Sequence, residues 1–167
     1  FAYAKEFNQA LDNWDVSKVI DMGGMFLRAD KFNQPLNSWD VLNVANMNRM
    51  FAKAINFNQA LNDWDVSSVT DMHDMFRFAT NFNQALNSWN VSNVTRMSVM
   101  FSGAEKFNQA LNNWNVSNVT DMSQMFEDAI AFKTKFNNGN PLPKDNNELK
   151  VWFKSDRMLA IDIKERE

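Results

Sequence analysis

The sequence contains no cysteine and a single histidine, His73, among its 167 residues. The lack of cysteine excludes disulfides, thiol catalysis and cysteine-ligated zinc or iron–sulfur centres. A nucleophile activated by a histidine is not expected either, because other copies of the internal repeat carry Ser, Asn or Gly in place of His73. The four glycines form no glycine-rich phosphate loop. We therefore predict a protein that is not an enzyme and that uses no cofactor or catalytic metal.

The sequence also lacks an excess of basic residues. The chain has 17 basic and 20 acidic residues, and its formal net charge is −3. A nucleic-acid-binding domain carries a basic surface, so nucleic acid is not a predicted partner. No block of like charge indicates a membrane-binding tail, and we expect no direct membrane insertion of this segment.

Methionine, tryptophan and phenylalanine are abundant instead, with 11, 6 and 15 copies. Most of them recur with one fixed period, a 25-residue unit repeated without insertion or deletion. Such a period indicates a stack of units that bury their apolar sides against one another. The predicted core residues at these repeat positions are Trp14, Trp39, Trp64, Trp89 and Trp114, together with Met25, Met50, Met75, Met100 and Met125.

Each unit combines two apolar spacings. A helical spacing of i, i+3, i+4 and i+7 is found at Met22, Met25, Phe26 and Ala29, and predicts a short helix or 3₁₀ turn over about residues 23–30. Trp14 and Val16 flank Asp15, an alternation that predicts a short parallel strand around residues 11–16.

The predicted organisation has two parts. Residues 1–132 form a repeat solenoid, with a partial unit over residues 1–6 followed by about five full units, and residues 133–167 form a C-terminal cap. In the cap, Asp145 and the following acidic residue Glu148 predict a helix start, and alternating apolar residues over 159–163 predict a closing strand. Because the first residues match the middle of a unit, we expect the chain to be a fragment or a processed product.

A polar ladder is expected along the stack. Every unit carries an asparagine followed by a glutamine, and the asparagines are Asn8, Asn33, Asn58, Asn83 and Asn108. Stacked carboxamides can donate to one neighbour and accept from the next, so we interpret them as a structural amide ladder. A carbohydrate-binding row of amides is the alternative.

A second row is a candidate ligand-binding surface. It runs along the polar side of the predicted strand and contains Asp15, Asp40, Asp65, Asp63, Asn90 and Asn115. Oxygen-rich side chains of this kind suit a hard cation such as calcium. They also form Asx turns, in which the side chain accepts from a nearby backbone N–H. The outward positions that Gly24 and Arg28 occupy in the first unit carry a different residue in every unit. Neutral drift on a solvated face and selection for binding a partner would both produce this variation.

Residues 108–126, NQALNNWNVSNVTDMSQMF, resemble the 25-residue unit of the BspA-like leucine-rich-repeat surface proteins, which abound in mycoplasmas. The resemblance covers residues 1–132 and implies a cell-surface or secreted location, with lipoprotein or wall anchoring outside this segment, and adhesion in some relatives. The predicted fold class is α/β: an LRR-like solenoid of 25-residue units, each with a short parallel strand and a short helix or 3₁₀ turn, ending in a C-terminal helix–strand cap. The alternative is a parallel β-helix.

The predicted function is that of a non-enzymatic bacterial cell-surface module for binding or adhesion. Its partner is expected to be a host matrix protein, a glycan or another surface protein, and the chain is expected to be monomeric. One alternative is a structural spacer or antigenic scaffold without a specific ligand, and a weaker one is a calcium-stabilised solenoid.

Overall fold

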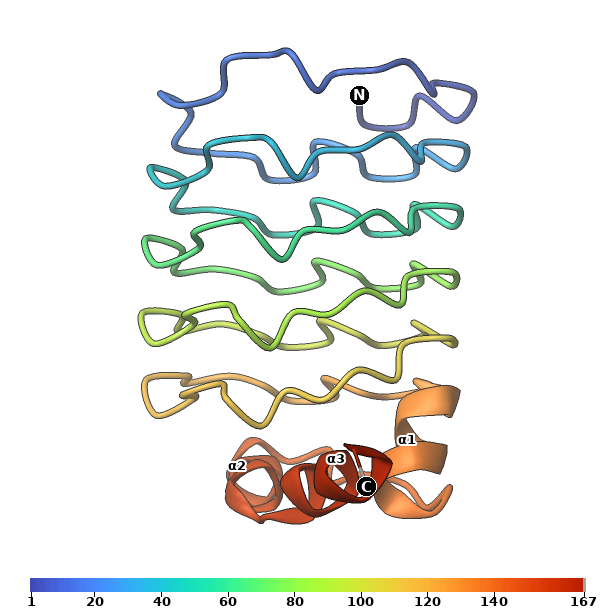
Figure 1. Ribbon diagram of the computed structural model, residues 1–167, viewed down its shortest axis with the longest axis vertical. Coiled ribbons are helices and arrows are strands. Elements are labelled where there is room, and N and C mark those ends of the chain that lie inside the picture. The colour runs from blue at the N-terminus through green and yellow to red at the C-terminus, as the bar shows by residue number, and fades with distance from the viewer. Residues whose placement is uncertain (167) are drawn as a thin grey trace.

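The 25-residue period of the sequence is also the period of the molecule in space (Figure 1). The computed structural model describes residues 1–166, in which irregular coils lie one above another. We number coils 1 to 5 as residues 7–31, 32–56, 57–81, 82–106 and 107–131. Residues 1–6 lie against coil 1 in the register of a preceding coil, because Tyr3 N–H donates to Leu27 O at 2.6 Å and Lys31 N–H donates to Lys5 O at 2.9 Å.

Two columns of phenylalanine run through the interior of the stack. In the first column, the rings of Phe26, Phe51 and Phe76 follow one another at centroid distances of 5.5 and 5.6 Å, nearly parallel. The second column lies beside it, and Phe51 contacts Phe57 at a centroid distance of 4.0 Å. Burying one such side chain stabilises the fold by about 1.5–3 kcal/mol. The repeated apolar side chains therefore form one continuous core.

Backbone hydrogen bonds join each coil to the next. In coil 1, the N–H groups of Met22, Gly24 and Phe26 donate to carbonyls of coil 2 at 2.9, 2.8 and 2.8 Å. The intervening N–H groups stay within their own coil: Met25 donates to Met22 O and Leu27 donates to Gly24 O. The backbone N–H groups therefore alternate between donating to the neighbouring coil and closing turns within their own coil. This pattern recurs along the stack.

This alternation explains why the predicted helix over residues 23–30 is wrong. An α-helix needs every N–H to donate to the carbonyl four residues earlier, whereas here every second N–H crosses to the next coil. Gly24 and Arg28 also adopt left-handed backbone conformations, with φ of 63° and 56°, which interrupt any helical run. The apolar spacing of a helix is therefore reproduced by successive tight turns.

The predicted strand over residues 11–16 is also wrong. Trp14 N–H donates to Leu11 O and Val19 N–H donates to Val16 O, so this segment turns twice instead of extending. Within the described residues, β pairing is limited to isolated parallel bridges from Asp21 to Asn46 and onward along the same column. Without strands there is no sheet, so neither the α/β LRR-like solenoid nor the parallel β-helix is the fold of this chain.

Within residues 1–166, three helices cover the C-terminal end of the stack (Figure 1): α1 (Ile130–Asn137), α2 (Asn146–Lys154) and α3 (Arg157–Arg166). The side chain of Asp145 caps α2 by accepting from two backbone N–H groups, as the sequence predicts. The predicted closing strand over residues 159–163 is wrong, because these residues belong to α3.

The helical end continues the aromatic core of the coils. Phe153 of α2 stacks on Phe126 of coil 5 at 6.4 Å, and Trp152 packs against Phe132 at 6.2 Å. The helices therefore shield the last coil from water. Among the described residues, no helix has the length and apolar character needed to cross a membrane.

Candidate binding surface

The row of acidic and amide residues forms Asx turns on the outside of the coils. Each side-chain oxygen accepts from the backbone N–H two residues later, at 3.0 to 3.2 Å, and the row consists of Asp15, Asp40, Asp65, Asn90 and Asn115. Hydrogen bonds from Ser17 and Ser67 lower the pKa of Asp15 and Asp65. All five side chains are exposed, so the row shapes the corner of each coil and leaves the rest of its polar atoms facing solvent.

Asp63 is held by amides from two coils. Its Oδ2 accepts from Asn37 Nδ2 at 2.6 Å, its Oδ1 accepts from Asn62 Nδ2 at 2.9 Å, and its N–H donates to Asn37 Oδ1 at 3.1 Å. Both carboxylate oxygens are therefore engaged, and Asp63 joins coil 2 to coil 3. Across the residues that the structure describes, no group of three or more acidic or histidine side chains is arranged to hold a metal ion.

The five asparagines of the expected ladder lie on one line along the stack, but their partners differ from the expected ones. Asn58 Oδ1 accepts from the backbone N–H of Asn83 at 2.9 Å and from Gln84 Nε2 at 3.0 Å, both in coil 4. The same arrangement links Asn8, Asn33 and Asn83 to the following coil. The ladder therefore runs from side chain to backbone, and glutamine supplies the second donor.

A tryptophan ladder was not apparent from the sequence. Trp64 Nε1 donates to Leu36 O of the preceding coil at 2.9 Å, and Trp39, Trp89 and Trp114 make the equivalent bond at 2.8 to 2.9 Å. The constant separation of leucine and tryptophan could have suggested a contact between adjacent units. Nothing in the sequence indicates that the indole N–H finds a backbone carbonyl.

Two of the ten predicted core residues at these positions are not buried. Trp14 is 48% exposed and Met25 is half-buried, whereas their equivalents in coils 2 to 5 are at most 5% exposed. The cause is position, because both lie in coil 1 at the open end of the stack. Burial in this protein is supplied by the neighbouring coil.

One variable surface of the stack follows the residues with left-handed backbone. It comprises the Gly24 column (Gly24, Arg49, Asp74, Val99 and Gln124) and the Arg28 column (Arg28, Lys53, Phe78, Gly103 and Asp128), all with φ between 51° and 69°. Bulky side chains in this conformation are strained, typically by about 1–2 kcal/mol. The backbone conformation is thus constant at positions where the side chains differ in every coil.

Phe78 is the bulkiest side chain of these two columns, and the residue is 36% exposed. The ring covers Gly103 in the next coil so closely that a Cβ there would lie 2.2 Å from Phe78 Cδ1. Lys53 Nζ and Arg77 Cζ lie 5.8 and 5.2 Å from the ring centroid. Cations at this distance are attracted to the face of an aromatic ring. The result is a partly exposed aromatic platform, held over Gly103 and accompanied by two positive charges.

A charged network borders this platform. The nearly buried carboxylate of Asp74 lies 3.3 Å from Arg49 Nε and 3.5 Å from Arg77 Nη1. Asp71 pairs with His73 at 2.9 Å and with Arg96 at 3.0 Å. Partial burial opposes ionisation of Asp71, but the hydrogen bonds and charges of His73 and Arg96 outweigh it and lower the pKa of its carboxyl.

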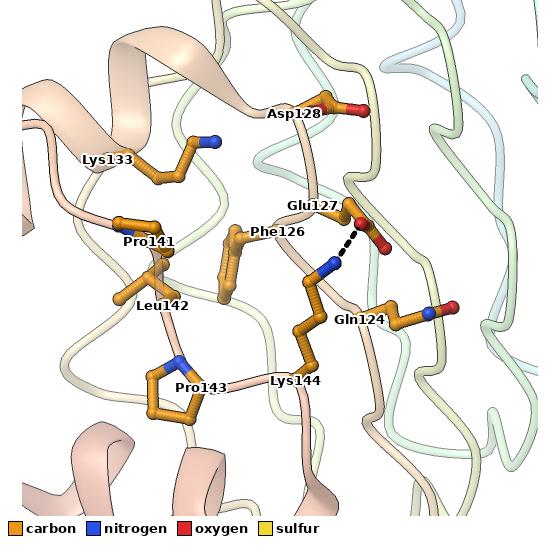
Figure 2. A pocket seen from close by; sticks show the side chains of 9 residues that line it. All are labelled: Gln124, Phe126, Glu127, Asp128, Lys133, Pro141, Leu142, Pro143 and Lys144. Atoms are coloured by element: carbon orange, nitrogen blue, oxygen red, sulfur yellow. Dashed lines mark hydrogen bonds and ion pairs between the residues drawn. The ribbon is translucent and has the colours of Figure 1, made fainter.

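A hollow of about 180 Å³ lies where coil 5 meets the segment before α2 (Figure 2). Its apolar wall is made by Phe126 and Leu142, and the Lys144 side chain points to the Glu127 carboxylate, with which it forms an ion pair. This pair raises the pKa of Lys144. Lys144 and Glu127 of the hollow are thus paired with each other, and this pair joins the segment before α2 to coil 5.

Comparison with known proteins gives one family. The family model described as "Mycoplasma protein of unknown function, DUF285" matches residues 1–77 and again residues 56–164. No curated protein and no solved structure matches the chain. The two matches together span both the coils and most of the helical end, and the chain therefore belongs to the DUF285 family of mycoplasma proteins.

Proposed function

We propose that this chain is a non-enzymatic, cell-surface binding module for adhesion to a host matrix protein, a glycan or another surface protein. Membership of a mycoplasma repeat family supports this proposal, as does the resemblance of residues 108–126 to the repeat of BspA-like surface proteins. The outward side chains differ from coil to coil on a constant frame, which is how repeat scaffolds present a binding surface.

The observation that carries the proposal is the Phe78 platform. A phenylalanine in a left-handed conformation with more than a third of its surface in water is unfavourable for folding alone, both by strain and by exposed apolar area. Gly103 leaves the space into which the ring fits. Aromatic residues, phenylalanine among them, are enriched in protein interfaces, and a few such side chains carry most of the binding energy.

The charges around the platform indicate a partner with anionic groups. The cationic side chains on and beside the Gly24 and Arg28 columns are Arg28, Arg49, Lys53 and Arg77, and the carboxylate of Asp74 lies among them. Neighbouring residues of this surface also contact one another: Arg28 Cζ lies 5.8 Å from the centroid of the Tyr3 ring, and Lys53 N–H donates to Arg77 O. The surface is thus locally positive in a chain of net charge −3.

The test is a binding screen against immobilised matrix proteins and glycans, with sulfated and unsulfated glycans side by side. We expect saturable binding to an anionic partner, weakened by added salt. Phe78→Ala should lose this binding, while Asp128→Ala, an exposed substitution in the same column, should keep it. A partner that binds the two variants equally would overturn the assignment of the surface.

A structural spacer is the competing function. A spacer or antigenic scaffold needs only the stacked core and would show no saturable partner in the same screen. Absence of saturable binding for the wild-type chain would therefore replace the proposed function with this one.

A further inference from the structure

Four asparagines of the chain lie two residues before a hydroxyl side chain: Asn90, Asn93, Asn115 and Asn118. The pattern Asn-X-Ser/Thr, with X other than proline, is the acceptor sequence for transfer of a sugar to the asparagine side chain. The sequence alone does not separate the four, because each has valine in the middle and serine or threonine at the third place. The structure divides them into two pairs.

Asn93 and Asn118 use their amide nitrogens to join coils. Asn93 Nδ2 donates to Ser67 O of the preceding coil, and Asn118 Nδ2 donates to Ser92 O, both at 2.7 Å. The threonine hydroxyl of each pattern also donates to a backbone carbonyl of the preceding coil, at 3.2 and 3.0 Å. Each of these nitrogens is thus turned toward the neighbouring coil, and neither hydroxyl bonds to its asparagine.

Asn90 and Asn115 have the opposite arrangement. Asn90 Oδ1 accepts from the N–H of Ser92 at 3.2 Å and from its hydroxyl at 2.7 Å, and Asn115 Oδ1 accepts from the same groups of Ser117 at 3.1 and 2.6 Å. A carboxamide nitrogen cannot accept these bonds, so the two donors turn each oxygen inward and each Nδ2 away from the turn. Both residues are exposed, and within residues 1–166 neither Nδ2 donates to a protein group.

We infer that Asn90 and Asn115 are acceptor sites for N-linked glycosylation of the folded chain, with a nucleotide sugar as donor and a separate transferase as catalyst. Nδ2 attacks the anomeric carbon of the donor, and the new N–C bond forms as the C–O bond to the nucleoside diphosphate breaks. The nucleoside diphosphate leaves with the bonding electron pair, and one Nδ2 proton passes to a base of the transferase. The serine hydroxyl stabilises the negative charge that develops on Oδ1 as this proton leaves.

The equivalent corners of coils 1 to 3 carry aspartate, which has no amide nitrogen to accept a sugar. Asp65 keeps the rest of the arrangement, because Ser67 donates its N–H to Asp65 Oδ1 at 3.0 Å and its hydroxyl to the same carboxylate. Asp40 keeps half of it, since Leu42 donates its N–H at 3.1 Å but has no hydroxyl. Asp65→Asn should therefore create a further acceptor site, whereas Asp40→Asn should not.

The test treats the folded chain with UDP-glucose and a purified asparagine glycosyltransferase that recognises Asn-X-Ser/Thr. Mass spectrometry of peptides then locates each added hexose, with Asn93 and Asn118 as internal controls. We expect Asn90 and Asn115 to react about tenfold faster than these controls, whose nitrogens must first break a hydrogen bond to the neighbouring coil. A proteolytic digest of the chain, in which no coil survives, should lose this difference.

Two variants extend the test with nearly isosteric changes, and circular dichroism checks that each keeps the wild-type fold. Asp65→Asn should gain a hexose at position 65, and Asp40→Asn should gain none at position 40. Equal rates at all four asparagines of the folded wild-type chain would overturn the inference. Absence of hexose from Asn90 and Asn115 in the folded chain would overturn it as well.

Discussion

The tryptophan ladder allows one substitution to be tested in two environments. Trp89→Phe removes an indole N–H that donates to Leu61 O at 2.9 Å, at a position where only 2% of the residue is exposed. Trp14→Phe removes the same group where the residue is 48% exposed and, within residues 1–166, makes no equivalent bond. Because the change is chemically identical, the difference between the two variants measures the contribution of the neighbouring coil.

The magnitude follows from two contributions. Leu61 O loses one of its two donors and keeps the backbone N–H of Trp64 at 3.2 Å, and a lost hydrogen bond of this kind costs about 0.5–1.5 kcal/mol. The smaller ring leaves a gap between the stacked indoles of Trp64 and Trp114, each 6.4 Å away, which adds about 1 kcal/mol. Trp89→Phe should therefore lower the free energy of unfolding by about 1.5–2.5 kcal/mol. Trp14→Phe should change it by less than about 0.5 kcal/mol, as for an exposed site.

The assay is equilibrium unfolding in urea, followed by circular dichroism and fluorescence. Coincident transitions are required, because stacked repeats can unfold in parts. Equal destabilisation of the two variants would refute the reasoning, since it would show that the indole hydrogen bond and burial between coils do not stabilise the stack.

Three further predictions follow from individual contacts. Gly103→Ala should destabilise the chain because its methyl group meets the Phe78 ring, and the added change Phe78→Ala should restore part of the loss, as measured by thermal unfolding. Asn58→Ala should cost about 1–2 kcal/mol because a backbone N–H of the next coil loses its acceptor, whereas Asn108, whose side-chain oxygen accepts from Gln109 of its own coil, should tolerate alanine better in urea titrations. The lowered pKa of Asp71 implies stability that is present above its ordinary pKa of 3.8 and lost as the pH falls through the folded value, so acid titration of Asp71→Asn should show a smaller loss than wild type.

The repeat period and most of the core could be predicted because both depend on side-chain identity alone. Tryptophans that recur with a 25-residue period must occupy equivalent places, and burial of Trp39, Trp64 and their later equivalents follows from stacking. Exposure of Trp14 could not be read from the repeat, since the pattern at Trp14 is the same as elsewhere. Only its place at the end of the stack distinguishes it.

The secondary structure could not be predicted because apolar spacing does not determine the direction of backbone hydrogen bonds. The spacing from Met22 to Ala29 fits a helix, yet residue 24 and residue 28 have positive φ, and in these two columns only Gly24 and Gly103 are glycines that would signal it. The alternation over residues 159–163 likewise fits a strand, but these residues lie in α3.

The role of the acidic and amide row in ligand binding stays a prediction, whereas its exposure follows from the sequence. The sequence placed the row beginning with Asp15 on the outside, and the Asx turns that it forms were one of the expected interpretations. The Phe78 platform was recognisable only as a bulky residue at a variable position. Its relation to Gly103 depends on a left-handed conformation that the sequence does not reveal.

The central claim is that the Phe78 platform binds the partner of this chain. Its most direct test is the dissociation constant of the partner found in the screen, measured for wild type, Phe78→Ala and Asp128→Ala by surface plasmon resonance. Loss of a central aromatic anchor should weaken binding by about tenfold or more, and Asp128→Ala should change it by less than about twofold. Wild-type affinity in Phe78→Ala would contradict the claim.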